Sequence, residues 1–165
     1  MIPNGCDSYI FENAPKNWSH QEISNTDFIA VYTGTHGLAN GLDVVIDAAD
    51  YLAKHKSKNI KIVLVGNGSQ KDRLKQLALN KKLTNILFLD PVSKNEVAAI
   101  LARANIGLQL LLDIKEFYYW TSPNKFFDYL SLGLPIINNY PGWVSNLINE
   151  NKCGIAVRPN DPNAL

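Results

Sequence analysis

The chain has 165 residues, with 16 Lys and Arg against 15 Asp and Glu, which leaves a formal net charge of +1. This length fits one domain, and a hydrophobic share of 46% suffices for a buried core, so disorder is excluded as the main state. The near-neutral charge argues against nucleic-acid binding, and no apolar run approaches the roughly 20 residues of a membrane span.

Strand-like and helix-like segments alternate along the chain. In order, we expect a strand at 28–32, a helix over 42–53, a strand at 60–65, a helix capped by Ser69, a strand at 86–89, a helix opened by a Ser93–Glu96 capping box, a strand at 106–112, a helix with Pro123 at its first position, a strand at 135–137, a helix over 143–150 and a strand at 154–157.

Continuous apolar strands between amphipathic helices are typical of a parallel sheet covered on both faces. The sequence therefore predicts an α/β, doubly wound, Rossmann-like fold over residues 1–165. The two ends, 1–5 and 161–165, resemble a linker and the first turn of a further helix, so we expect a fragment of a longer protein. Cys6 and Cys153 stand alone, which favours a reducing, cytoplasmic setting over a disulfide framework or a zinc site.

A glycine-rich loop follows the first predicted strand. Gly34, Gly37 and Gly41 allow close backbone approach to a ligand, and the next helix N-terminus suits a phosphate. Within this loop, Thr35 would contact the ligand, while His36 is either a donor to it or a solvated side chain. The alternative for the whole loop is a flexible connection.

Two further loops fall at carboxyl ends of predicted strands, where open parallel sheets bind ligands. Gly66-Asn67-Gly68 is either the floor of a nucleotide or sugar site or a tight turn. In Ser122-Pro123-Asn124-Lys125, the lysine occupies a helical first turn, which opposes the helix dipole unless it meets an anion. Asp128 could accept hydrogen bonds from ribose hydroxyls, or could simply pair with Lys125.

These loops resemble the C-terminal, donor-binding half of a GT-B glycosyltransferase of retaining family 4 (group 1), in a subgroup that acts on bacterial surface polysaccharides. The resemblance covers essentially the whole chain, and residues 122–135 are its most specific match. The other matching segments are Ile2-Pro3-Asn4-Gly5-Cys6-Asp7, residues 34–43, Leu64-Val65-Gly66-Asn67-Gly68, residues 88–93 and Gly154-Ile155-Ala156-Val157.

The resemblance implies retaining transfer of a hexosyl or N-acetylhexosaminyl group from a nucleoside-diphosphate sugar, with UDP as the nucleotide and no metal or other cofactor. It assigns Lys125 to the diphosphate, Asp128 to the ribose and the Val92 backbone to the base. It also implies that a missing N-terminal domain carries the acceptor site, that a C-terminal crossover helix is absent and that the fragment alone is inactive. The acceptor would be a glycan or a lipid-linked sugar, and only the missing domain would meet the inner face of the membrane.

Four positions depart from the family pattern. Trp120 stands where many members carry the first of two glutamates, and Asp128 replaces the second. Thr35 and Asn40 stand where many members carry Arg and Lys, so diphosphate binding would rest more heavily on Lys125 and backbone dipoles.

Three other functions stay open at this point. A sugar-nucleotide 2-epimerase shares the GT-B architecture, and its product analysis without acceptor would separate it from a transferase. A donor-binding module without activity is compatible with the absent glutamate. A receiver- or flavodoxin-like module would need an acidic pair after the first strand, which Tyr32-Thr33-Gly34 does not provide.

Overall fold

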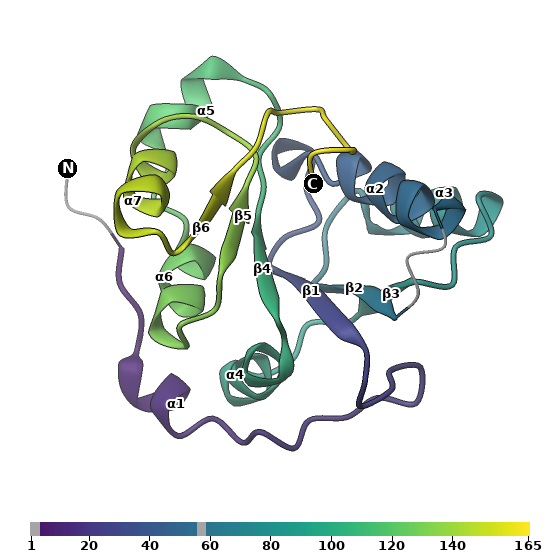
Figure 1. Ribbon diagram of the computed structural model, residues 1–165, viewed down its shortest axis with the longest axis horizontal. Coiled ribbons are helices and arrows are strands. Elements are labelled where there is room, and N and C mark those ends of the chain that lie inside the picture. The colour runs from purple at the N-terminus through teal and green to yellow at the C-terminus, as the bar shows by residue number, and fades with distance from the viewer. Residues whose placement is uncertain (1–3, 56–58) are drawn as a thin grey trace.

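The computed structural model describes residues 4–55 and 59–165, apart from the Trp120 side chain, so Ile2 and Pro3 of the family-like motif lie outside it. Within these ranges one parallel sheet has the strand order β3-β2-β1-β4-β5-β6, the doubly wound order (Figure 1). Its strands are β1 (Phe28–Thr33), β2 (Ile60–Val65), β3 (Ile86–Leu89), β4 (Ile106–Gln109), β5 (Ile136–Asn138) and β6 (Gly154–Ala156).

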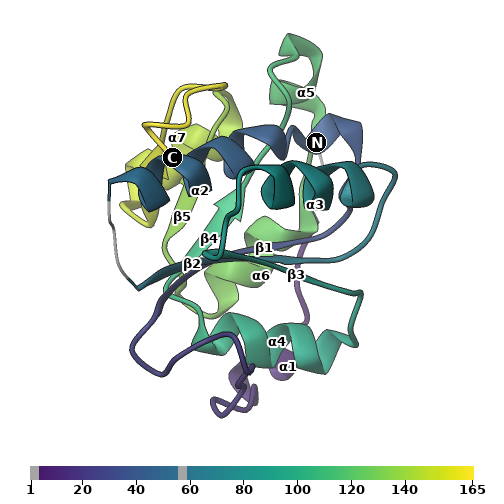
Figure 2. The ribbon, with the colours of Figure 1, turned by 90° about the vertical axis from the view of Figure 1, so that its right-hand side faces the viewer.

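Helices cover both faces of the sheet, as predicted. Figure 2 shows α2 and α3 on one face and α4, with α1 beneath it, on the other. The helices are α1 (Ser8–Glu12), α2 (Asp43–Lys54), α3 (Lys71–Asn80), α4 (Lys94–Arg103), α5 (Lys115–Trp120), α6 (Asn124–Ser131) and α7 (Trp143–Asn151), with a 3-10 turn, η1 (Leu38–Asn40), before α2.

Side-chain alternation along β1 divides the buried residues into two cores. Ile29 and Val31 pack in the core under α1, α4, α6 and α7. Ala30 and Tyr32 pack in the core under α2 and α3. Because both faces are buried, the strand reads as a continuous apolar run rather than an alternating one.

Three local expectations differ from the structure. Ser69 does not cap α3: the N-cap is Gln70, and the Lys71 N–H that a Ser69 cap could have bound donates to the Gly68 carbonyl. Pro123 is the N-cap of α6 rather than its first residue, because its carbonyl already accepts the Phe126 N–H. The expected strand at 106–112 ends at Gln109, and the following backbone pairs with Asn139 and with Ala39.

The capping box is confirmed. The Glu96 N–H donates to Ser93 Oγ at 3.3 Å, and Glu96 Oε2 accepts the Ser93 N–H at 3.0 Å. Helices α1 and α5 were not expected from the sequence, because each is too short for a helical apolar period to be visible.

Candidate donor site

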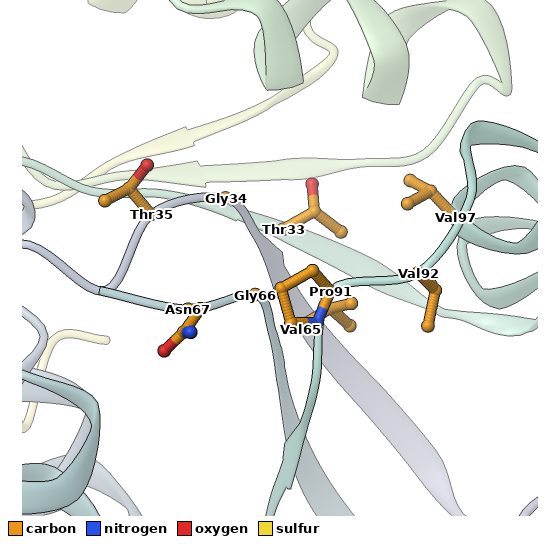
Figure 3. Close-up of a pocket in the computed structure, with 9 residues that line it drawn as sticks. All are labelled: Thr33, Gly34, Thr35, Val65, Gly66, Asn67, Pro91, Val92 and Val97. Atoms are coloured by element: carbon orange, nitrogen blue, oxygen red, sulfur yellow. The ribbon is translucent and has the colours of Figure 1, made fainter.

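Two adjoining cavities open at the carboxyl ends of the central strands, where the strand order reverses between β1 and β4. Their volumes are about 350 Å³ and about 370 Å³, which is within the range of small-molecule sites. The first is lined from the ends of β1 and β2 and from the connection into α4 (Figure 3). The second lies between the end of β1 and the N-termini of α4 and α6.

The lining includes many of the residues predicted from sequence. The first cavity has Gly34, Thr35, Gly66, Asn67 and Val92 in its wall, and the second has Thr35, Pro123, Asn124, Lys125 and Asp128. Five predicted residues lie outside both linings: His36, Gly37, Gly41, Gly68 and Ser122. The two cavities share Thr33, Gly34, Thr35 and Val97, so a single extended ligand could occupy both.

The two glycine loops are packed directly against one another. A Cβ on Gly66 would lie 2.0 Å from the Gly34 carbonyl oxygen, and one on Gly68 would lie 2.5 Å from the His36 carbonyl oxygen. The Gly34 N–H donates to Val65 O and the His36 N–H donates to Asn67 O. These two N–H groups are therefore not free for a phosphate, and the glycines serve the contact between the loops.

Lys125 crosses the end of β1 to reach a side chain of the opposite core. Its ammonium lies 4.4 Å from the Tyr32 ring centre and donates to the Tyr32 hydroxyl at 3.3 Å. Gly34 makes room, since a Cβ there would lie 3.1 Å from Lys125 Cε. The Tyr32 hydroxyl in turn donates to the Thr35 carbonyl at 2.9 Å.

Burial lowers the pKa of Lys125 to about 8. Among the described residues, no carboxylate lies within ion-pair distance of this ammonium. A bound anion would supply the missing counter-charge and would favour the protonated form. The α6 N-terminus, which has no side-chain cap, adds unpaired N–H groups beside it.

Asp128 does not pair with Lys125, which was one of the two readings of the sequence. It pairs instead with Lys94, whose ammonium lies 2.8 Å from Oδ1 and 2.7 Å from Oδ2. Lys94 is the first residue of α4 and lines the second cavity together with Asp128. Lys94 was not predicted from the sequence as a site residue, although it occupies a helical first turn just as Lys125 does.

Lys71 is a second lysine near the site that was not predicted from the sequence. Its side chain is only 4% exposed and donates to the carbonyls of Gly66 and Leu89 and to Asp90 Oδ1, all within 2.8 Å. These bonds join the ends of β2 and β3 beneath the first cavity. The Lys71 hydrogen bond is also the largest reason that the pKa of Asp90 is lowered.

His36 is not solvated, and it lines neither of the two cavities. Its exposure is 0%, and its ring lies between Tyr32 and Phe88, at centre distances of 6.0 and 6.3 Å. Neither ring nitrogen has a hydrogen-bond partner among the residues that the structure describes. Burial, followed by the positive charge of Lys71, lowers the pKa of His36 to about 4, so the ring is neutral at pH 7.

Residues 4–55 and 59–165 contain no group of three or more His, Cys, Asp or Glu side chains that could hold a metal ion. No helix in the same ranges is long and apolar enough to cross a membrane.

Comparison with known families gives one extensive match. The family model for glycosyl transferases group 1 matches residues 15–165 of the chain. A comparison with curated proteins finds no match.

Among solved structures, the chain is similar to the C-terminal domain of LpcC, a glycosyl transferase group 1 family protein from Francisella tularensis (TM-score 0.68, 19% identity, 96% of this chain and 83% of that one). It is also similar to Anabaena HepE, solved with UDP and glucose (TM-score 0.72, 16% identity, 98% of this chain and 43% of that one). A third similar structure is S. aureus TarM, whose complex contains UDP (TM-score 0.69, 18% identity, 92% of this chain and 28% of that one). The chain thus spans less than half of the HepE and TarM chains.

Proposed function

The chain belongs to the glycosyl transferases group 1 family, and on that premise we propose that it binds the nucleoside-diphosphate-sugar donor of a glycosyltransferase, with UDP as the nucleotide. The observation that carries this proposal is the half-buried Lys125 ammonium, which faces the second cavity beside the α6 N-terminus with a phenol as its partner. A diphosphate has the charge and the acceptor oxygens that such a site lacks.

The proposed donor runs through both cavities. The base occupies the first cavity, whose wall includes Val65, Pro91 and Val92, and it meets the backbone of Val92. The ribose hydroxyls donate to Asp128, and the diphosphate lies against Lys125 and the first N–H groups of α6. The sharing of Thr33, Gly34 and Thr35 by the two cavities supports one continuous ligand.

In the proposed reaction, the bond between the anomeric carbon and the diphosphate oxygen breaks, and its electron pair stays on the diphosphate. An acceptor hydroxyl oxygen bonds to the anomeric carbon on the same face, and its proton passes to the leaving diphosphate. Lys125 and the α6 N–H groups stabilise the charge that develops on the leaving group, without a metal ion. We further propose that a hexosyl or N-acetylhexosaminyl group is transferred.

The acceptor, a glycan or a lipid-linked sugar, is proposed to bind in a second domain. The C-terminal domain of LpcC is similar to this chain over most of its length, whereas HepE and TarM extend well beyond the similar part. These proportions support the assignment of the chain to a donor-binding domain, which would not turn over by itself.

Calorimetric titration with UDP, uridine and pyrophosphate tests the proposal. UDP should bind with an affinity well above that of uridine, because the diphosphate adds contacts to a cationic site. A chain that binds none of the three, or that binds uridine as tightly as UDP, would contradict it.

A further inference from the structure

Asp128 is a buried carboxylate whose two oxygens are both bonded to one ammonium. Its side chain is 8% exposed, whereas that of Lys94 is 44% exposed and faces the second cavity. The Lys94–Asp128 distances of 2.8 and 2.7 Å describe a two-point contact. This contact fixes both the position and the plane of the carboxylate.

Lys94 also makes a cation–π contact with an aromatic ring of α1. Its ammonium lies 4.9 Å from the ring centre of Phe11, a residue of α1 that is 1% exposed. As the first residue of α4, Lys94 also sits where a cation opposes the helix dipole. The carboxylate and the aromatic ring therefore compensate for a placement that the helix alone disfavours.

The ion pair leaves hydrogen-bonding capacity on a carboxylate that lines the second cavity. A carboxylate has about four lone-pair sites, and the ammonium occupies one on each oxygen of Asp128. The two remaining sites match the two vicinal hydroxyls of a ribose. Asp128 can therefore accept a ribose without releasing Lys94.

We propose that Lys94 is a positioning residue for donor binding: held by the Phe11 ring, it orients the Asp128 carboxylate toward the ribose hydroxyls. This inference rests on the proposed function, which assigns the ribose to Asp128. It adds a residue that acts through Asp128 and ties the N-terminal helix α1 to the ribose end of the site.

The test compares UDP with 2′,3′-dideoxy-UDP, which lacks both hydroxyls but keeps the base and the diphosphate. In the wild-type chain, UDP should bind at least about tenfold more tightly, because hydrogen bonds to a charged group are lost in the analogue. In Lys94→Met this ratio should fall to about threefold or less. Lys94→Arg, which can still contact both carboxylate oxygens, should keep most of the ratio.

Two further variants test the Phe11 contact and provide a control. Phe11→Leu removes the ring face but keeps an apolar side chain. Introduced alone, it should lower the ratio of UDP to dideoxy-UDP affinity partially. Combined with Lys94→Met, it should cause no further decrease. Lys54→Met is the matched control, because Lys54 pairs with Asp50 on the exposed surface of α2. It should leave the ratio unchanged.

The outcomes separate the two claims. If the tenfold wild-type ratio persists in Lys94→Met, the positioning role of Lys94 is wrong, but the assignment of the ribose to Asp128 stands. This holds even if both nucleotides bind more weakly, because a lysine that acts only on the diphosphate or on stability lowers both affinities equally. A wild-type ratio near one overturns the assignment of the ribose to Asp128, and the inference with it.

Discussion

The Lys125 ammonium lies 4.4 Å from the ring centre of Tyr32 and 3.3 Å from its hydroxyl oxygen. The phenol orients the ammonium without neutralising it, since burial raises the pKa of Tyr32 and keeps its hydroxyl protonated. The Tyr32 hydroxyl in turn donates a hydrogen bond to the Thr35 carbonyl. The second cavity therefore retains a directed positive charge.

Replacement of this charge should weaken UDP binding selectively. Lys125→Met keeps the apolar part of the side chain but removes the ammonium, and UDP affinity should fall by about 10- to 100-fold, the usual effect of losing hydrogen bonds to a charged group. Uridine affinity should change by about twofold or less, because the nucleoside has no phosphate. Calorimetry on both ligands measures the difference. An equal loss for UDP and uridine would argue against a diphosphate contact.

The pH dependence of UDP binding should also follow Lys125. Its pKa is about 8 in the free protein, and a bound diphosphate raises that pKa, so binding takes up a proton near pH 8. Affinity should fall as the pH rises, by roughly fivefold between pH 7 and pH 8.8. The terminal phosphate of UDP is already ionised over this range. Lys125→Arg stays charged and should show a flat profile; a wild-type profile equally flat would contradict the assignment.

The contact between the glycine loops should be sensitive to a single methyl group. Gly66→Ala places a Cβ 2.0 Å from the Gly34 carbonyl oxygen at a φ of +142°, and should cost at least about 2 kcal/mol in the free energy of unfolding. Gly37→Ala is the matched control, because its φ is −99° and its nearest neighbour is an ordinary contact at 3.4 Å. Urea unfolding should place Gly37→Ala within about 0.5 kcal/mol of the wild type. Similar losses for both would show that the loops are not closely packed.

His36 should make the folded chain sensitive to mild acid. Its pKa is about 4 when folded and about 6.5 when unfolded, so between these values the unfolded state binds more protons and stability falls as the pH falls. The expected loss from this residue is about 2 kcal/mol between pH 7 and pH 5. Urea unfolding of the wild type and His36→Leu at both values isolates the effect, because the leucine variant lacks it. Parallel pH profiles would mean that His36 titrates normally in the folded chain.

The sheet could be predicted from the sequence because both of its faces are buried. A strand such as Ile60–Val65, covered on both sides, is apolar apart from Lys61, and its bounds were predicted without error. The capping box at Ser93 is a local pattern of the same kind. In contrast, the Gln70 N–H is satisfied by the His36 carbonyl, a tertiary contact that no local pattern could show.

The site was only partly predictable, because its pairings also depend on tertiary contacts. Lys71, Lys94 and Lys125 all occupy helical first turns, and the dipole argument that selected Lys125 applies to the other two. Their acceptors come from other parts of the chain: Asp128 for Lys94, and the ends of β2 and β3 for Lys71. The pairing of Asp128 with Lys94 rather than with the nearby Lys125 depends on how α4 packs beside α6.

A crystal structure of the chain with bound UDP tests the central claim most directly. We expect the diphosphate oxygens to lie within hydrogen-bonding distance of Lys125 Nζ and of the first N–H groups of α6, with the ribose hydroxyls on Asp128 and the base against Val92. A cavity still empty at saturating UDP, or a nucleotide bound away from Lys125, would contradict the account.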